Sequence, residues 1–104
     1  MQISINAREL VLTDPLRDYI NKRMESLSKY LKRFDADLIR AEVEVARTTQ
    51  HHRHGDVFYA EVNLTLPGKL LRATHEGSDI RACIDAVKST IQREIDKYKD
   101  QLEK

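Results

Sequence analysis

The sequence predicts an α+β domain with the element order β-α-β-β-β-α, in which two helices pack on one face of a four-stranded mixed sheet. Two observations support this prediction. Four short segments alternate apolar and polar residues, which is typical of strands with one face in solvent. Two longer segments, residues 14–34 and 80–102, instead repeat their apolar residues at helical spacing. A length of 104 residues without repeats or linkers indicates one domain, residues 1–104, with its own core.

The first strand and the first helix follow each other closely. Residues 1–7 alternate, with both isoleucines on the same side. The helix is expected to begin at Thr13 or Asp14, because either side chain can cap its first turn, and Pro15 is tolerated there. It should continue to Phe34 and turn one face toward the core. That face comprises Leu16, Ile20, Leu27, Leu31 and Phe34.

Three more strands should form an antiparallel meander after a right-handed crossover from the first strand. Residues 39–47 and 57–66 both alternate in polarity. Pro67 and Gly68 predict a tight turn, because proline presets φ and glycine accepts a positive φ. The last strand is expected over residues 70–75. The solvent-exposed face of this sheet should carry Arg40, Glu42, Glu44, Tyr59 and Glu61.

The closing helix should pack beside the first one, since each helix has a single apolar stripe. Ser78 or Asp79 is expected to cap it, and Asp85 to help orient it. Cys83 falls on the apolar side, where a free cysteine ordinarily serves as a small buried residue. The apolar stripe comprises Ile80, Ile84, Val87, Ile91, Ile95, Tyr98 and Leu102.

Basic residues are concentrated in the first helical segment. Residues 14–34 hold six basic and three acidic residues, a net charge of +3. Residues 35–78 hold five basic and seven acidic residues, a net charge of −2, and the whole chain carries only +1. This asymmetry indicates that one part of the surface meets an anionic partner.

Cations form stripes on both helices. The first helix carries Lys22, Lys29 and Arg33 in a row, with Arg23 and Lys32 nearby. The closing helix carries Arg93 and Lys97 on one flank and Arg81, Lys88 and Lys99 on the other. Neighbouring helices would pool these rows, which suit the phosphodiester backbone of RNA. Double-stranded or compactly folded RNA is favoured, because no aromatic platform for single-stranded bases is evident. Alternatively, the charges only solvate the helices and pair locally, as Asp18 could with Lys22.

The sequence offers little for catalysis or metal binding. It contains no glycine-rich phosphate loop and no nucleophile elbow. His51, His52 and His54 could hold a metal, but one short loop rarely supplies the tetrahedral geometry that zinc prefers. These histidines could instead contact phosphate when protonated. We therefore expect no enzyme activity, metal or cofactor. A cytoplasmic location is expected, because neither a secretory signal nor a membrane-spanning apolar run is present.

Two blocks of the sequence resemble one known family. The blocks "AREL…LTDPLRDYI…LSKYLKRF" and "EGSDIRACIDAV…REIDKYKDQL" resemble the bacterial ribosome hibernation-promoting factor and ribosome-associated translation inhibitor family, over essentially the whole chain. The resemblance implies a fold similar to double-stranded RNA-binding domains. It also implies a monomer that docks on the small ribosomal subunit, free or in intact ribosomes, near the decoding centre. There it would block mRNA and tRNA without chemistry, under stress or in stationary phase. The expected rRNA-binding residues are Lys22, Arg23, Lys29, Lys32, Arg33, Arg81, Lys88, Arg93, Lys97 and Lys99.

The chain departs from the family pattern at three positions. The family usually has Tyr where Arg81 stands, Lys where Thr90 stands and Gln where Glu94 stands. One phosphate contact is thus missing, for which Arg81 and Lys88 could compensate. Long members carry a C-terminal domain that pairs ribosomes, whereas this chain is expected to belong to the short class without one.

A second function stays open at this point. The protein could be an interaction module whose open sheet face or edge binds another protein, such as a regulator of transcription. The two functions differ in their salt dependence. RNA docking should weaken steeply as salt rises, whereas a protein contact on the sheet should respond little.

Overall fold

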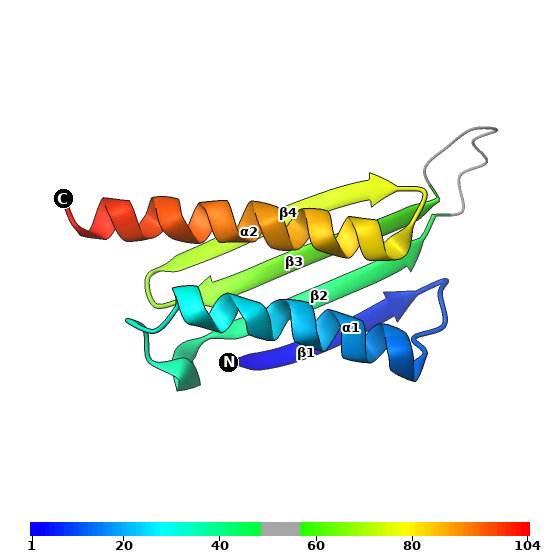
Figure 1. Cartoon of the computed structure of the whole chain (residues 1–104), viewed down its shortest axis with the longest axis horizontal. Helices are drawn as coiled ribbons and strands as arrows, with labels where there is room; N and C mark the ends of the chain where they lie inside the picture. Colours follow the sequence, from blue (N-terminus) through cyan, green and yellow to red (C-terminus); the bar gives the residue numbers. More distant parts are fainter. Residues whose placement is uncertain (49–56) are drawn as a thin grey trace.

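The computed structural model describes residues 1–48 and 57–104 and confirms the predicted element order (Figure 1). The histidines of residues 51–54 lie outside the described residues, so their role stays a prediction. Two short 3₁₀ helices, η1 (Ser26–Tyr30) and η2 (Ala36–Leu38), connect the first helix to the second strand. The remaining elements are β1 (Gln2–Arg8), α1 (Asp14–Glu25), β2 (Arg40–Arg47), β3 (Phe58–Leu66), β4 (Lys69–Gly77) and α2 (Ile80–Leu102).

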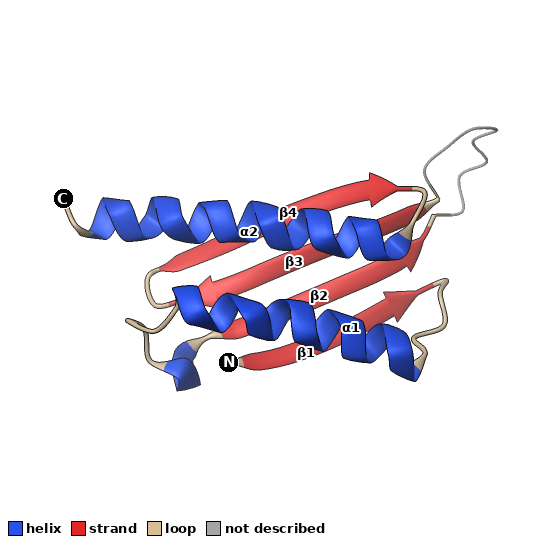
Figure 2. Cartoon of the chain, viewed as in Figure 1, coloured by secondary structure: helices blue, strands red, loops and turns tan. Residues whose placement is uncertain are grey.

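The four strands form one mixed sheet in the order β1-β2-β3-β4 (Figure 2). β1 runs parallel to β2, and β2, β3 and β4 are antiparallel neighbours, as a β-α-β unit followed by a meander requires. β4 is longer than predicted, because Gly77 still pairs with Phe58. The register sets Val43 opposite Val62, and both side chains are buried under the helices.

The turn between β3 and β4 matches its prediction. Leu66 pairs with Lys69, and Gly68 has a φ of 81°, the value that a type II turn requires at its third residue. The Tyr98 hydroxyl donates a hydrogen bond to the Pro67 carbonyl oxygen at 2.8 Å. A Cβ atom at Gly68 would lie only 3.0 Å from that hydroxyl oxygen. The turn therefore anchors α2 to the sheet through a close approach that glycine permits.

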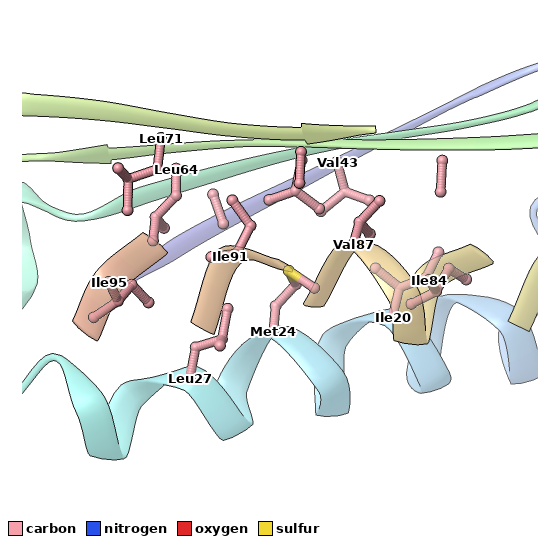
Figure 3. Close-up of a cluster of buried hydrophobic side chains, with 14 of the residues drawn as sticks. Ile20, Met24, Leu27, Val43, Leu64, Leu71, Ile84, Val87, Ile91 and Ile95 are labelled. Carbon is pink, nitrogen blue, oxygen red and sulfur yellow. The ribbon is translucent and has the colours of Figure 1, made fainter. Parts of the chain in front are cut away.

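Both helices lie on the same face of the sheet, side by side and running in the same direction (Figure 1). Their apolar stripes meet the sheet in one buried layer, where Ile20 and Ile91 are fully buried (Figure 3). The assignment of Leu102 to this layer is wrong: the residue is 51% exposed, because α2 extends beyond the sheet at its C-terminal end (Figure 1). Neither α1 nor α2, nor any other helix in the described ranges, is long and apolar enough to span a bilayer.

Side-chain caps fix where the two α-helices begin. The Thr13 Oγ1 atom accepts a hydrogen bond from the Leu16 amide at 3.3 Å. The Asp79 Oδ1 atom accepts one from the Arg81 amide at 3.4 Å. Each cap satisfies a backbone donor that the first turn leaves without an intrahelical partner.

The first helix is shorter than the sequence predicts. The α-helix ends at Glu25 and gives way to η1, although residues 14–34 keep a helical apolar spacing. The Ser26 hydroxyl donates to the Arg23 carbonyl oxygen at 2.6 Å, and such a local bond competes with regular helical geometry. The tighter 3₁₀ turn still buries Leu27 in the core. The expected basic stripe is consequently spread over α1, η1 and the loop that follows.

Candidate nucleic-acid interface

The line of contact between α1–η1 and α2 is polar, and we call it the interhelical seam. Its contacts join residues 62 to 70 positions apart in the sequence. Since the helices are parallel, the start of α2 meets α1 and the end of α2 meets η1 (Figure 1). The seam consists of Tyr19, Arg23, Tyr30 and Arg33 on one side and Arg81, Asp85, Lys88, Lys99 and Glu103 on the other.

One end of the seam is organised around a carboxylate, in what we call the Asp85 cluster (Tyr19, Arg23, Arg81 and Asp85). Asp85 Oδ1 accepts hydrogen bonds from the Tyr19 hydroxyl at 2.6 Å and from the Arg23 Nε atom at 2.7 Å. The guanidinium carbons of Arg23 and Arg81 lie 5.5 and 4.8 Å from the centroid of the Tyr19 ring. Both distances are within the range of cation–π attraction.

The ionisation of the Asp85 cluster follows from these contacts. The hydrogen bond from Arg23 is the main cause that lowers the pKa of Asp85, so this carboxyl is ionised at neutral pH. The hydrogen bond to Asp85 raises the pKa of Tyr19, which keeps its proton. Arg23 is held in its charged form, chiefly by the same hydrogen bond. The cluster therefore contains two fixed cations and one fixed anion.

The other end of the seam ties the end of α2 to η1. The Lys99 Nζ atom donates to the Tyr30 carbonyl oxygen at 3.0 Å, which satisfies a carbonyl at the end of η1. Arg33 pairs with Glu103, with 2.9 Å between the Arg33 Nη2 and Glu103 Oε1 atoms. Both side chains of this pair are largely exposed, so it contributes little stability. These contacts nevertheless hold Lys99 and Arg33 close together.

The ten predicted rRNA-binding residues do not form one continuous row. Arg23, Arg33, Arg81, Lys88 and Lys99 lie in the seam, and Lys22, Lys29 and Lys32 lie on the exposed side of α1–η1 and its loop. At about 100° per residue, Arg93 and Lys97 lie on the order of 140° round the α2 axis from the seam. The exposed Asp96 and Asp100 lie between these two flanks. The structure therefore brings five of the ten cations into the seam, and the other five lie outside it on the exposed sides of the same elements.

Most of these cations have no carboxylate partner within the described part of the chain. Of the ten, only Arg23 and Arg33 make ion pairs there. None of the ion pairs found in residues 1–48 and 57–104 joins Asp18 to Lys22, the local pair that the sequence suggested. Two of the other lysines have uncharged neighbours. The Lys88 Nζ atom donates a hydrogen bond to the Gln92 Oε1 atom at 2.9 Å, and the Lys29 Nζ atom lies 5.3 Å from the centroid of the Tyr30 ring. The helical face thus retains a surplus of accessible positive charge.

The open face of the sheet has a different character. Glu61 accepts hydrogen bonds from the Tyr59 hydroxyl, the Asn63 amide and the Arg72 guanidinium, at 2.6, 2.8 and 2.9 Å. We call these four residues the Glu61 cluster. The bond from Tyr59 is the main cause that lowers the pKa of Glu61 to about 2, and burial raises the pKa of Tyr59 to about 12. Three carboxylates, Glu61 among them, line a shallow depression of about 220 Å³ on this face. The depression is therefore unsuited to a polyanion.

Four residues of the seam were not identified as functional from the sequence: Tyr19, Tyr30, Asp85 and Glu103. Asp85 was expected only to help orient α2. Asp85 makes no cap, and binds α1 instead. The available signal was the four-residue spacing of Tyr19 with Arg23 and of Arg81 with Asp85, which puts each pair on one helix face. No group of three or more possible metal ligands forms in the described segments.

Comparison with known proteins connects this arrangement to a family. The family described as "Sigma 54 modulation protein / S30EA ribosomal protein" matches residues 3–103. The fold is similar to that of the Thermus thermophilus Protein Y N-terminal domain, with a TM-score of 0.77, 25% identity and coverage of 94% of this chain and 99% of that one.

Curated relatives fall into two lengths. A Klebsiella oxytoca protein named ribosome hibernation promoting factor is 28% identical over 102 residues, which cover 98% of this chain and 97% of that protein. A Deinococcus radiodurans protein named ribosome hibernation promotion factor is 26% identical over 100 residues, which cover 95% of this chain. The chain spans about half the length of the Deinococcus protein, since the match covers 50% of it.

Proposed function

Because this chain belongs to the Sigma 54 modulation protein / S30EA ribosomal protein family, we propose that it is a ribosome hibernation factor. Its relatives named hibernation factors match it from end to end or over about half of their own length. The proposed target is the rRNA of the small ribosomal subunit near the decoding centre, in free subunits or intact ribosomes of the cytoplasm. Binding there would exclude mRNA and tRNA and stop translation under stress or in stationary phase.

The observation that carries the proposal is the uneven charge of the two faces. All ten predicted contact residues lie on α1, η1, the loop after η1 or α2, and eight of them have no carboxylate partner in the described part of the chain. The sheet face opposite presents an acidic depression. Cations at several depths along a rigid surface match the phosphates of a folded RNA, and each neutralised phosphate releases counterions. The helical face is therefore the docking face.

The proposed inhibition needs no chemical step. A bound domain that occupies the mRNA and tRNA path acts by steric exclusion, so its strength depends only on affinity and occupancy. Among the ten residues, we propose that the five in the seam and the three lysines of α1, η1 and the following loop contribute most. Arg93 and Lys97 would contact a second RNA segment, or would contribute only through the long-range field of the domain.

Cosedimentation with purified small ribosomal subunits tests the proposal. We expect the protein to pellet with subunits at about 50 mM salt and to be released near 300 mM, because several phosphate contacts together give an affinity loss of on the order of a thousandfold. Absence of binding at low salt would overturn the proposal. Binding that is insensitive to salt would instead favour a protein contact through the sheet.

A further inference from the structure

We propose that Arg23 and Arg81, held beside the ring of Tyr19, form a preorganised site for a single phosphate group of RNA. The inference rests on the proposed function, because it takes an RNA of the small subunit as the source of that phosphate. It goes further in naming one site, its two donors and the two residues that position them. Tyr19 and Asp85 are positioning residues, and the two guanidinium groups are the ligands.

The two guanidinium groups share one support. Their carbon atoms lie 5.5 and 4.8 Å from the centroid of the same tyrosine ring. Arg81 is exposed, so its guanidinium group is accessible to an anion and its side chain has room to turn toward Arg23. Two arginines converging on one phosphate provide more donors than any single side chain of the domain can.

Asp85 leaves the binding edge of Arg23 free. Its Oδ1 atom engages Arg23 through Nε, at 2.7 Å, rather than through the two terminal nitrogens. Asp85 is the only carboxylate that binds Arg23 in residues 1–48 and 57–104, and it leaves the terminal nitrogens for the fork-like contact that guanidinium makes with phosphate. The same Oδ1 atom accepts the Tyr19 hydroxyl, which fixes the ring as well. Ordering these side chains before binding lowers the entropy lost when a ligand arrives.

The local charge favours an anion. Arg23 and Arg81 are accompanied by Lys88, which is close enough to lower the pKa of Asp85 further. The site and its immediate surroundings thus contain three cations and one carboxylate. Asp85 already accepts two hydrogen bonds, and Arg81 has no carboxylate partner within the described ranges. A phosphate would relieve the mutual repulsion of the two guanidinium groups while keeping their contact with the ring.

Arg81 distinguishes the proposed site from the usual pattern of the family that the sequence resembles. The family that the sequence resembles usually has a tyrosine at that position, and a tyrosine cannot supply the second guanidinium. A purely structural stack of Arg81 on Tyr19 would leave RNA affinity unchanged when Arg81 is replaced. The two roles are therefore separable by measurement.

A double-mutant cycle tests whether the two arginines share one phosphate. Arg23→Gln, Arg81→Gln and the double variant would be compared in affinity for purified small ribosomal subunits, at several salt concentrations, with Arg40→Gln on the open sheet face as the matched control. We expect each single variant to lose about tenfold and the double variant well under a hundredfold, with the salt slope falling by about one in total. Arg40→Gln should lose less than about twofold.

Three outcomes would overturn the inference. Single variants that match Arg40→Gln would show that the arginines bind no phosphate. A double variant that loses the full hundredfold, with a slope change near two, would show separate phosphates. Nitrogen-15 NMR of the arginine Nε groups tests the site in the absence of ribosomes. Titration with inorganic phosphate should change the chemical shifts of Arg23 and Arg81 with one common dissociation constant. Independent or absent shifts would contradict a shared site.

Tyr19 variants separate positioning from simple destabilisation. Tyr19→Phe keeps the ring and should retain most of the coupled shift, whereas Tyr19→Leu removes the support and should abolish the coupling while the protein stays folded by circular dichroism. If wild-type protein fails to bind subunits at low salt but phosphate still shifts both arginines together, the ribosomal target is wrong and the anion site stands. If subunits bind and the arginine variants do not matter, only the site is wrong.

Discussion

Asp85 between the helices and Glu61 on the open face of the sheet each accept a tyrosine hydroxyl at 2.6 Å and each bind an arginine. Their surroundings differ. Glu61 receives three donors, and Asn63 and Arg72 are register partners on neighbouring strands. Its side chain is 18% exposed, against 39% for Asp85. The Glu61 carboxylate is therefore closed off and saturated, whereas the Asp85 carboxylate is more open and accepts two donors.

The difference shows how the same three side-chain types serve structure or recognition. Residues two apart on a strand point to the same face, so a sheet brings its polar groups into contact with one another. Parallel helices meet only along a line, and each contributes side chains that reach past the contact into solvent. The carboxylate in the sheet is therefore saturated by its neighbours, while the carboxylate between the helices accepts two donors and stays more exposed.

The largest effect should come from removing charge from the helical face. Changing three lysines to glutamine lowers the net charge by three, and so does changing three exposed neutral residues of the sheet face to glutamate. We expect the first variant to lose on the order of a hundredfold in small-subunit affinity at low salt, and the second less than about threefold. Equal losses would show that only net charge matters. The variants are Lys22→Gln, Lys29→Gln and Lys88→Gln against Gln2→Glu, Thr65→Glu and Thr74→Glu.

A smaller effect is expected when each carboxylate loses its charge. Glu61→Gln should lower the free energy of unfolding by about 1–2 kcal/mol at pH 7, because a saturated, mostly buried acceptor is replaced by a group that repels one of its donors. Asp85→Asn should lower it by less than about 1 kcal/mol, since the Asp85 carboxylate is itself more exposed than that of Glu61. Urea unfolding measures both. A larger cost at Asp85 would contradict the distinction between a closed and an open cluster.

The acid dependence of stability should reflect the same distinction. The pKa of Glu61 is lowered from 4.5 to about 2 in the folded protein, so its contribution is complete above about pH 4.5 and is lost as pH falls toward 2. Asp85 acts in the same direction, because its pKa is also lowered. Melting temperatures between pH 7 and 2 should fall less steeply for Glu61→Gln than for the wild type. Parallel curves would show that Glu61 is not the group responsible.

The smallest effect is expected at the far end of the seam. Glu103→Gln breaks the exposed pair with Arg33 and should change the free energy of unfolding by less than about 0.5 kcal/mol. The same change removes an anion from the proposed docking face, so small-subunit affinity should rise slightly, by about twofold. Weaker binding of this variant would indicate that Glu103 is needed to position Arg33.

Much of the fold could be predicted from local sequence. The main difference is the end of α1, which lies at Glu25 rather than at Phe34. Thr13 and Gly68 have the conformations that their cap and turn demand. The end of α1 was missed because Leu27 keeps its core position in either helix type. The change of helix type coincides with the hydrogen bond of the Ser26 hydroxyl, whose partner cannot be read from apolar spacing.

The composition of the site was easier to predict than its arrangement. A helical wheel separates Arg93 and Lys97 from Arg81, Lys88 and Lys99, but it does not say which flank adjoins the other helix. That choice depends on the side on which α1 packs, which is a property of the whole sheet. The partners of Asp85 lie 62 and 66 positions away, beyond the reach of any local pattern. Tyr19 therefore looked like part of the core.

The seam unites segments that the ribosome would synthesise far apart in time. Its first contributors end at Arg33, and its second begin at Arg81, with the three strands of the meander made in between. A nascent chain that has emerged only as far as β4 holds five of the ten predicted contact residues and none of the contacts between the two helices. We expect such a chain to be inert toward the machine that is producing it. Under the proposed function, competence would arrive only after α2 has been synthesised and has packed beside α1.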